Sequence, residues 1–221
     1  MAKLVFHWPE RRIKFFHGDC LPVMEKMKDR SNIGLICTDP PYGSNFRGRW
    51  GGKWEDRPMR GDKSLGWITP VFKEIHRVAH PNAYMFSFYG WPNVDVFMEA
   101  WKAADWKPIS HISVIKRQMG LGYHTRSKHE TMFALVKRQG KAKPIGSAPQ
   151  DVIFSRVIES VKNRLHSSQK PGDPLVQIIE KFAPANQYVF DPFAGSASTL
   201  VAAMRANRPC IGVELGEGAE G

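Results

Sequence analysis

Short apolar runs and helical patterns alternate along this chain, and this alternation constrains the fold more than any other feature. Seven runs are rich in branched and aromatic residues, as strands are, and they cover residues 13–16, 33–38, 83–88, 109–115, 131–136, 188–190 and 210–213. Because helical patterns fill most of the intervals, we expect an α/β fold with one seven-stranded, mostly parallel sheet. No clear helix separates 109–115 from 131–136, which predicts an antiparallel edge strand.

The expected helices cover residues 21–28, 69–78, 94–104, 175–182 and 198–206. Thr69 suits the cap of the second helix, with Pro70 in its first turn, and Asn93 suits the cap of the third. Two stretches interrupt this rhythm. Residues 43–66 combine Gly, Arg, Lys and Trp without periodicity, which predicts a long, mobile, basic loop. Residues 139–165 form a short insert, with a short helix expected at 151–161. The 221 residues are otherwise expected to form a single domain.

The charge of the chain indicates a polyanionic partner. Lys and Arg total 32 against 21 Asp and Glu, a net charge of +11, and the isoelectric point is about 9.7. Twelve of the basic residues and only three acids lie between residues 116 and 170. A concentrated excess of this kind favours a nucleic-acid partner over a basic surface that serves only solubility.

Other function classes are disfavoured by what the sequence lacks. Its three cysteines, Cys20, Cys37 and Cys210, are too few and too widely spaced for a disulfide framework or a structural zinc site. His124, His129 and Glu130 make a poor ligand set, so we expect no metal. No run approaches the roughly 18 apolar residues of a membrane span, and the first residues carry no secretory apolar stretch. We therefore expect a cytoplasmic protein without a membrane partner.

The sharpest chemical signal is Asp39-Pro40-Pro41-Tyr42-Gly43, directly after the apolar run at 33–38. Ligands of parallel sheets bind at the carboxyl ends of strands. There the Asp39 carboxylate and the Pro40 carbonyl can accept both hydrogens of one amino group, while the Tyr42 ring stacks on a flat ligand. The alternative is an ordinary strand-ending turn, because Asp and Pro are also turn residues.

A second signal lies far away in the sequence. Residues 188–199 (YVFDPFAGSAST) read as a strand, a glycine turn and a helix start, which lets the backbone approach a ligand closely. About twenty residues later, Glu214 ends the next apolar run, where a carboxylate can hold ribose hydroxyls. The segment has no GxGxxG pattern for a dinucleotide, so it predicts a different nucleoside cofactor.

Together these segments resemble the amino-group DNA methyltransferases that use S-adenosylmethionine. Residues 39–42 (DPPY) resemble the catalytic motif of that family, and residues 191–199 (DPFAGSAST) resemble its cofactor loop. The order, catalytic motif first, is that of the permuted β-group. Residues 17–21 (HGDCL) and 166–171 (HSSQKP) are similar to two further motifs. One departure is Ala197, where the family commonly has a second glycine, and its methyl group is expected to tighten the approach to the cofactor.

The resemblance implies a Rossmann-like fold and assigns roles to particular residues. The catalytic residues would be Asp39, Pro40 and Tyr42. The cofactor S-adenosylmethionine would be bound by Asp19, Cys20, Asp39, Lys170, Asp191, Phe193, Ala194, Gly195, Ser196 and Glu214. DNA would be bound by Pro41, Tyr42, Phe46, Arg47, Arg126, Lys137 and Arg138.

The activity expected from this resemblance is methylation of adenine N6 in DNA, on a base flipped out of the duplex. The short insert at 139–165 predicts a short or relaxed target sequence, and the setting would be a phage or a restriction–modification system. Methylation of cytosine N4 and an inactive nucleic-acid-binding protein are the alternatives. Duplex DNA is the favoured partner, with single-stranded DNA and RNA as alternatives.

Overall fold

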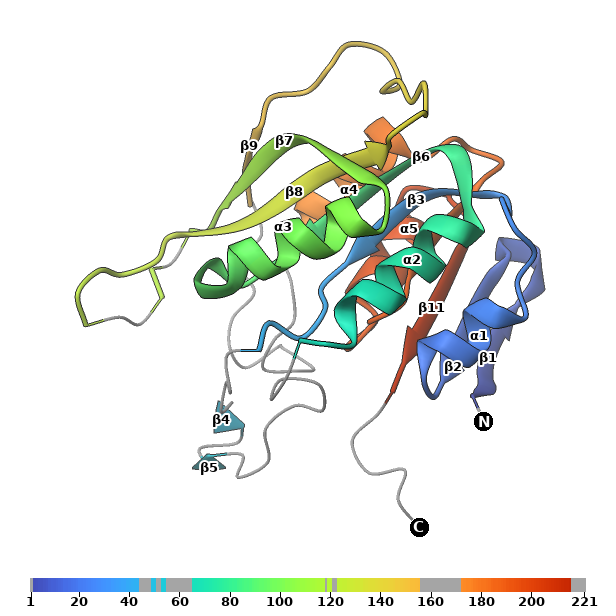
Figure 1. Cartoon of the computed structure of the whole chain (residues 1–221), viewed down its shortest axis with the longest axis horizontal. Coiled ribbons are helices and arrows are strands. Elements are labelled where there is room, and N and C mark those ends of the chain that lie inside the picture. The colour runs from blue at the N-terminus through green and yellow to red at the C-terminus, as the bar shows by residue number, and fades with distance from the viewer. Residues whose placement is uncertain are drawn as a thin grey trace.

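One nine-stranded sheet runs through the protein in the order β1-β2-β11-β10-β3-β6-β8-β7-β9 (Figure 1). The computed structural model describes residues 2–43, 49–50, 53–54, 65–117, 119–120, 123–155 and 172–215. The strands of this sheet are β1 (Lys3–Trp8), β2 (Ile13–His17), β3 (Ile33–Thr38), β6 (Ala79–Phe88), β7 (Trp106–Ile115), β8 (His129–Lys137), β9 (Val152–Phe154), β10 (Tyr188–Asp191) and β11 (Cys210–Glu214). A separate two-stranded pairing, β4 (Arg49–Trp50) with β5 (Lys53–Trp54), lies within the expected basic loop.

The expected fold class is confirmed, and all seven expected strands belong to the sheet. Strands β2, β11, β10, β3 and β6 are parallel neighbours. Strand β8 runs antiparallel to both β6 and β7, as the missing helix between the two runs predicted. It lies inside the sheet, however, because it is between β6 and β7. Strand β9 pairs beyond β7 and strand β1 pairs beyond β2, so these two form the edges. These two edge strands are the ones that the sequence pattern missed.

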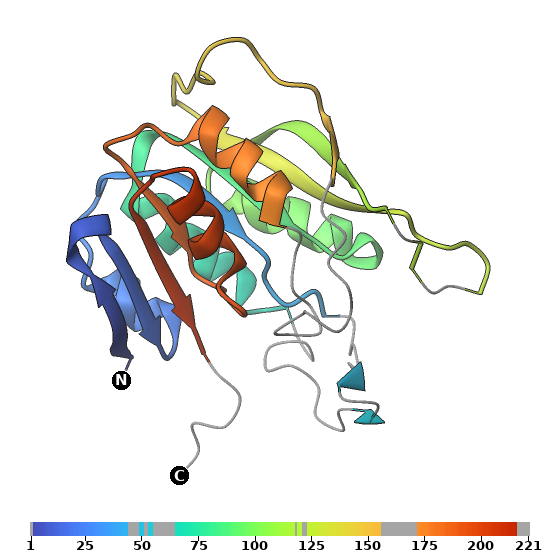
Figure 2. The same ribbon diagram turned by 180° about the vertical axis from the view of Figure 1, so that it is seen from behind.

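The helices cover both faces of the sheet. Helices α1 (Cys20–Glu25), α2 (Ile68–Val78) and α3 (Val94–Ala103) lie on the face toward the viewer in Figure 1. Helices α4 (Gly172–Phe182) and α5 (Ser198–Arg205) lie on the other face, seen in Figure 2. The short 3-10 turns η1 (Pro9–Arg11) and η2 (Trp91–Asn93) complete the elements. Among the described helices, none has the length and apolar character needed to cross a membrane.

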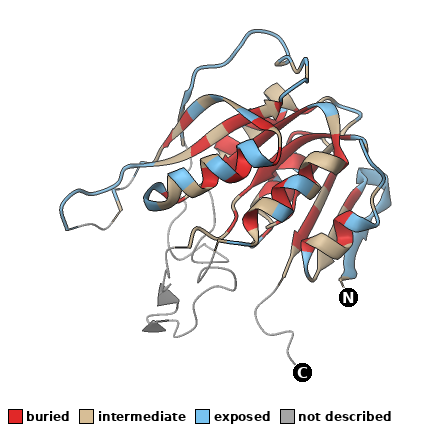
Figure 3. Cartoon of the chain, in the orientation of Figure 1, coloured by how far each residue is buried: buried red, intermediate tan, exposed pale blue. Residues whose placement is uncertain are grey.

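The core explains why the central strands are almost wholly apolar. All six residues of β3 are buried. Leu35 and Cys37 belong to the cluster that packs under α4 and α5, whereas Ile36 between them belongs to the cluster under α1, α2 and α3. Since side chains alternate between the two faces, a strand covered on both sides needs a continuous apolar run. Figure 3 shows this buried layer between exposed helix surfaces.

Three local expectations are corrected. Thr69 does not cap α2, because the helix begins at Ile68 and the cap position is Trp67, without a side-chain hydrogen bond. Asn93 holds the cap position of α3, but its side chain makes no cap and binds elsewhere. The helix expected at 151–161 is replaced, in its described part, by strand β9, which pairs with β7.

Candidate active site

Asp39 follows β3 at the carboxyl edge, which is the edge of the sheet where β2, β11, β10, β3 and β6 all end. Pro40 is buried, while Asp39, Pro41 and Tyr42 are partly buried. The Tyr42 hydroxyl donates a hydrogen bond to the Asp39 carboxylate. The backbone then turns at Gly43, whose φ of 71° lies in the left-handed region that favours glycine. The segment 39–43 therefore presents a carboxylate, a rigid backbone and an aromatic ring together.

The loop after β6 holds Tyr42 in place. The Asn93 side-chain amide donates to the Tyr42 backbone carbonyl at 2.7 Å. Gly90 lies so close that a Cβ built on it would stand 2.8 Å from the Tyr42 Cβ. The Tyr42 ring also meets the edge of the Phe97 ring, with centroids 6.4 Å apart. This support was not predicted from the sequence, because Asn93 matched a helix cap.

The turn between β10 and α5 lies on the neighbouring strand. The Asp191 carboxylate is 3% exposed, and it accepts a hydrogen bond from the Phe193 backbone N–H at 3.1 Å. Gly195 has a φ of 49°, and a Cβ built there would meet no atom within 4 Å. The Gly195 N–H donates to the Glu214 carboxylate at 2.6 Å. The turn thus exposes backbone toward open space beside a carboxylate.

The backbone conformation of Ala197 gives a reason why glycine is common at this position in the family. Its φ of 62° and ψ of 26° are left-handed, a conformation that costs an L-residue about 1–2 kcal/mol. Glycine adopts it freely. The expectation was that the methyl group would crowd the cofactor, and the structure adds a backbone reason for glycine at this position.

Three carboxylates gather at this edge. The pKa of Asp191 is raised to about 7, chiefly by burial and also by the charges of Asp39 and Glu214, although hydrogen bonds from Thr199 and Phe193 act to lower it. Strand β10 lies between β3 and β11, so neighbouring strands bring these acids together from positions 39, 191 and 214. The surroundings therefore favour a cation, because a positive charge placed here relieves the mutual repulsion of the acids.

Asp19 and Cys20 stand at the same edge, at the start of α1. The Asp19 carboxylate caps α1 by accepting from the Leu21 N–H at 2.9 Å, and the Gly18 N–H donates to the Glu214 carbonyl at 2.8 Å. Cys20 is buried, and this burial raises the pKa of its thiol to about 12. Cys20 is therefore a neutral packing group beside the turn.

Trp67 is a further member of the site that sequence reasoning missed. It precedes α2, and its ring lies against the ring of Phe193, with centroids 5.4 Å apart. Ala194 is buried, while Ser196 is partly buried and lies 3.1 Å from the Ser198 hydroxyl. A tryptophan beside a long basic loop gave no pattern that would have assigned it to the turn.

Lys137, an expected DNA contact, lies far from Asp39 and binds the protein's own backbone. Lys137 ends β8, which is antiparallel to β6, so it lies at the amino edge of the sheet, opposite Asp39. Its side chain is 9% exposed, and its ammonium donates to the carbonyls of His76 at 2.6 Å and Ala79 at 3.0 Å. Burial lowers the pKa of Lys137. It serves as a buried donor to the end of α2.

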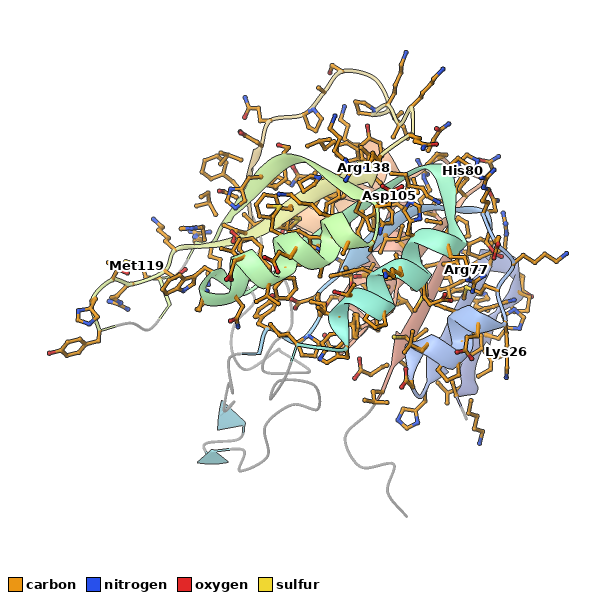
Figure 4. The ribbon with its side chains drawn as sticks, in the orientation of Figure 1. Lys26, Arg77, His80, Asp105, Met119 and Arg138 are labelled. Atoms are coloured by element: carbon orange, nitrogen blue, oxygen red, sulfur yellow. The ribbon has the colours of Figure 1, made fainter. Side chains whose placement is uncertain are left out.

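The expected DNA contact of Arg138 is also at the wrong edge. Arg138 is exposed, and its guanidinium donates to the Asp105 carboxylate at 2.8 Å. Figure 4 labels this pair at the upper side of the molecule, whereas β11 ends toward the lower side in Figure 1. A duplex whose base reached Asp39 would lie on the opposite edge of the sheet.

The remaining predicted residues divide into two groups. Arg126 lies in the connection between β7 and β8, where it is exposed and donates to the Gly120 carbonyl at 3.1 Å. Phe46, Arg47 and Lys170 lie outside the described residues, as do 156–165 of the expected insert. The described part contains no cluster of three or more His, Cys, Asp or Glu side chains suited to a metal ion.

Known proteins resemble the chain over most of its length. The sequence model of the N6/N4 DNA methylase family matches residues 33–220. YubD of Escherichia coli (strain K12), which its name describes as a methylase, is 39% identical over 91% of this chain and 84% of its own length. DNA adenine methyltransferase YhdJ of the same strain is 26% identical over 90% of this chain and 77% of its own length.

Solved structures share the fold. The M1.HpyAVI complex with S-adenosylmethionine superposes with a TM-score of 0.68 and 23% identity, over 93% of this chain and 94% of its own. The cytosine-N4-specific PvuII DNA methyltransferase superposes with a TM-score of 0.72 and 16% identity, over 93% and 82%. The sheet described above is therefore the Rossmann-like sheet of DNA methyltransferases.

Proposed function

The chain belongs to the N6/N4 DNA methylase family, a family that uses S-adenosylmethionine, and we propose that it is a DNA adenine N6-methyltransferase. The observation that carries this proposal is the Asp39 carboxylate at the carboxyl end of β3, one strand away from the turn at Gly195. Aspartate in the first position of the catalytic motif resembles the adenine type of the family. The relative YhdJ, named as an adenine methyltransferase, adds support.

The residues of the turn fit the cofactor. Glu214 would hold its ribose hydroxyls, Asp19 would contribute to the binding of its adenine, and the open space at Gly195 leaves room for it beside the turn. The gathered acids favour a sulfonium cation. When bound, S-adenosylmethionine supplies an electrophilic methyl group. The packed rings of Trp67 and Phe193 form one wall beside the turn.

The chain's own residues would activate the nucleophile. The exocyclic nitrogen of adenine is weakly nucleophilic because its lone pair is delocalised into the ring. Hydrogen bonds from its two N–H groups to the Asp39 carboxylate and the Pro40 carbonyl favour a tetrahedral nitrogen with a localised lone pair. As the nitrogen is methylated it gains positive charge, which the same two acceptors stabilise. They therefore stabilise the transition state more than the ground state.

Tyr42 would receive the base. An adenine in a duplex must be flipped out before its amino group reaches Asp39. The Tyr42 hydroxyl bonds to Asp39 in this structure, so an incoming amino group replaces that donor on the carboxylate. The ring, held by Asn93 and Phe97, then stacks on the base. We further propose a short or relaxed target sequence, in line with the short insert at 139–165.

Asp39→Ala and Asp39→Asn test this mechanism. Alanine removes the acceptor and should lower kcat by about 10²–10³-fold, whereas asparagine keeps one carbonyl acceptor and should fall between alanine and wild type. Binding of S-adenosylmethionine, measured by calorimetry, should weaken far less than kcat falls, because Asp191 and Glu214 remain and the main partner of Asp39 would be the amino group. Activity of Asp39→Ala within a few-fold of wild type would overturn the mechanism.

Cytosine N4 methylation is the second candidate. The family includes both reactions by name, and the cytosine-N4-specific PvuII enzyme shares the fold. The same two acceptors would serve the amino group of cytosine. Identification of the methylated nucleoside by mass spectrometry separates the two activities.

A further inference from the structure

The described residues of the connection between β7 and β8, which are 116–117, 119–120 and 123–128, project from the body of the molecule (Figures 1 and 2). We call this connection the projecting hairpin. It continues the ladder of the two strands, because the Lys116 N–H donates to the Lys128 carbonyl at 2.7 Å and the Gly120 N–H donates to the Ser127 carbonyl at 2.7 Å. The Arg126 guanidinium also donates to the Gly120 carbonyl at 3.1 Å. These hydrogen bonds therefore hold the described residues of the hairpin in shape in the absence of a partner.

The strand register places the projecting hairpin beside the Asp39 site. Thr38, just before Asp39, is level with Ser87 on β6, Ser87 is level with Phe133 on β8, and Phe133 is level with His111 on β7. Three strand spacings separate β3 from β7, about 14 Å. Beyond this level β7 continues for four residues to Ile115, about 13 Å further. The hairpin thus rises past the carboxyl edge, alongside the site.

The charge of the projecting hairpin is of one sign. It contains Lys116, Arg117, Arg126 and Lys128, and no Asp or Glu. Arg117, Arg126 and Lys128 are exposed, whereas Lys116 pairs with Glu130 at 3.5 Å. The basic residues at the amino edge lie on the far side of the sheet from Asp39. The hairpin is therefore a described basic element on the side of the sheet where a substrate of the site would lie.

The end of the hairpin carries exposed apolar side chains. Tyr123 is 96% exposed and Met119 is 55% exposed, and Figure 4 labels Met119 at the far end of the molecule. The Tyr123 ring meets the edge of the His124 ring, with centroids 4.9 Å apart. Exposed aromatic and methionine side chains flanked by cations match the surface of a nucleic acid, where base edges lie between phosphates.

We propose that the projecting hairpin enters the major groove of the duplex whose adenine occupies the Asp39 site. Arg117, Arg126 and Lys128 bind phosphates, and Tyr123 reaches the base edges. A two-stranded ribbon fits a major groove about 12 Å wide. The lateral offset of about 14 Å corresponds to about four base-pair steps, so the contacted phosphates lie within that distance of the target. This inference rests on the proposed function, and it replaces Lys137 and Arg138 as the DNA contacts.

The test compares two triple variants. Arg117→Gln/Arg126→Gln/Lys128→Gln removes the three exposed charges of the hairpin, and Lys107→Gln/Lys141→Gln/Lys143→Gln removes three exposed charges at the amino edge. Affinity for a 20-base-pair duplex is measured against salt concentration by fluorescence anisotropy. The hairpin variant should lose about 2.7 from the log–log slope and about 100-fold in affinity at 0.15 M salt. The amino-edge variant should match wild type.

Each outcome of the comparison decides between two claims. Unchanged slope in the hairpin variant, with wild type still methylating duplex DNA, overturns the inference and leaves the proposed function intact. If the hairpin variant loses the slope but the wild-type protein transfers no methyl group to DNA, the inference stands and the proposed function is refuted. The same titrations are made with RNA of the same sequence. If the hairpin variant loses affinity for RNA but not for duplex DNA, duplex DNA is not the partner of the hairpin.

Two further measurements guard against misfolding and against a merely electrostatic role. Binding of S-adenosylmethionine by the hairpin variant should equal that of wild type, and if it does not, the three single variants should each lower the slope by about 0.9. Tyr123→Ala should change the bases found within about four positions of methylated sites on random DNA. An unchanged context would remove Tyr123 from the proposed contact.

Discussion

The burial of Asp191, at the start of the turn between β10 and α5, predicts how the stability of the protein depends on pH. Its carboxyl group is 3% exposed, and burial raises its pKa from 3.8 to about 7. Between these two values the folded chain holds a proton that the unfolded chain has released. The free energy of unfolding therefore falls as the pH rises through this range. From the two pKa values, the contribution of Asp191 to this fall between pH 5 and pH 8 is about 2–3 kcal/mol.

Asp191→Asn removes the titration and keeps a carbonyl acceptor for the Phe193 N–H. Relative to wild type, the free energy of unfolding of the variant should rise by about 2–3 kcal/mol between pH 5 and pH 8. Urea unfolding followed by circular dichroism at both pH values measures this change. Asp151→Asn is the control, because Asp151 is exposed. A difference between wild type and Asp191→Asn that stays constant from pH 5 to pH 8 would refute the reasoning.

Three further predictions concern single side chains. Ala197→Gly should raise the free energy of unfolding by about 0.5–1 kcal/mol by releasing a left-handed alanine, and a Tm no higher than wild type would contradict the strain. Lys137→Met should lower it by about 2–4 kcal/mol, because two buried carbonyls lose their donor. DNA affinity of that variant should stay unchanged in anisotropy titrations, and weaker DNA binding without loss of stability would make Lys137 a DNA contact after all. Tyr42→Phe should keep kcat/KM within about fivefold of wild type, while Tyr42→Ala should lose about ten- to a hundredfold. Equal losses in steady-state assays would assign the effect to the hydroxyl bonded to Asp39 rather than to the ring.

The central strands and the site at their carboxyl ends were predictable from the sequence. A strand covered on both faces needs an unbroken apolar run, so residues 33–38 stood out. Polar residues that directly follow such runs in parallel strands must meet at one edge, which brought Asp39 and Glu214 together. Edge strands carry no such signal. Strand β1 is exposed along its whole length, and β9 has three residues, so neither could be told from a loop.

The missed residues are those whose role depends on tertiary contacts. Lys137 was read as a surface charge, since a lysine's pattern in sequence does not reveal that two carbonyls will surround it. Asn93 matched a helix cap, yet its amide donates to the backbone carbonyl of Tyr42, in the segment that follows β3. The charge count between 116 and 170 found the basic region but could not assign its parts to opposite edges. That assignment follows from β8 running antiparallel to β6.

The central claim is that the edge around Asp39 methylates N6 of adenine in DNA. The most direct measurement incubates the protein with duplex DNA and S-adenosylmethionine carrying a deuterated methyl group, and then identifies labelled nucleosides by mass spectrometry. We predict label in N6-methyladenine, and its loss in Asp39→Ala protein that still binds the cofactor. Label in N4-methylcytosine, or no label in DNA from protein that binds the cofactor, would contradict the account.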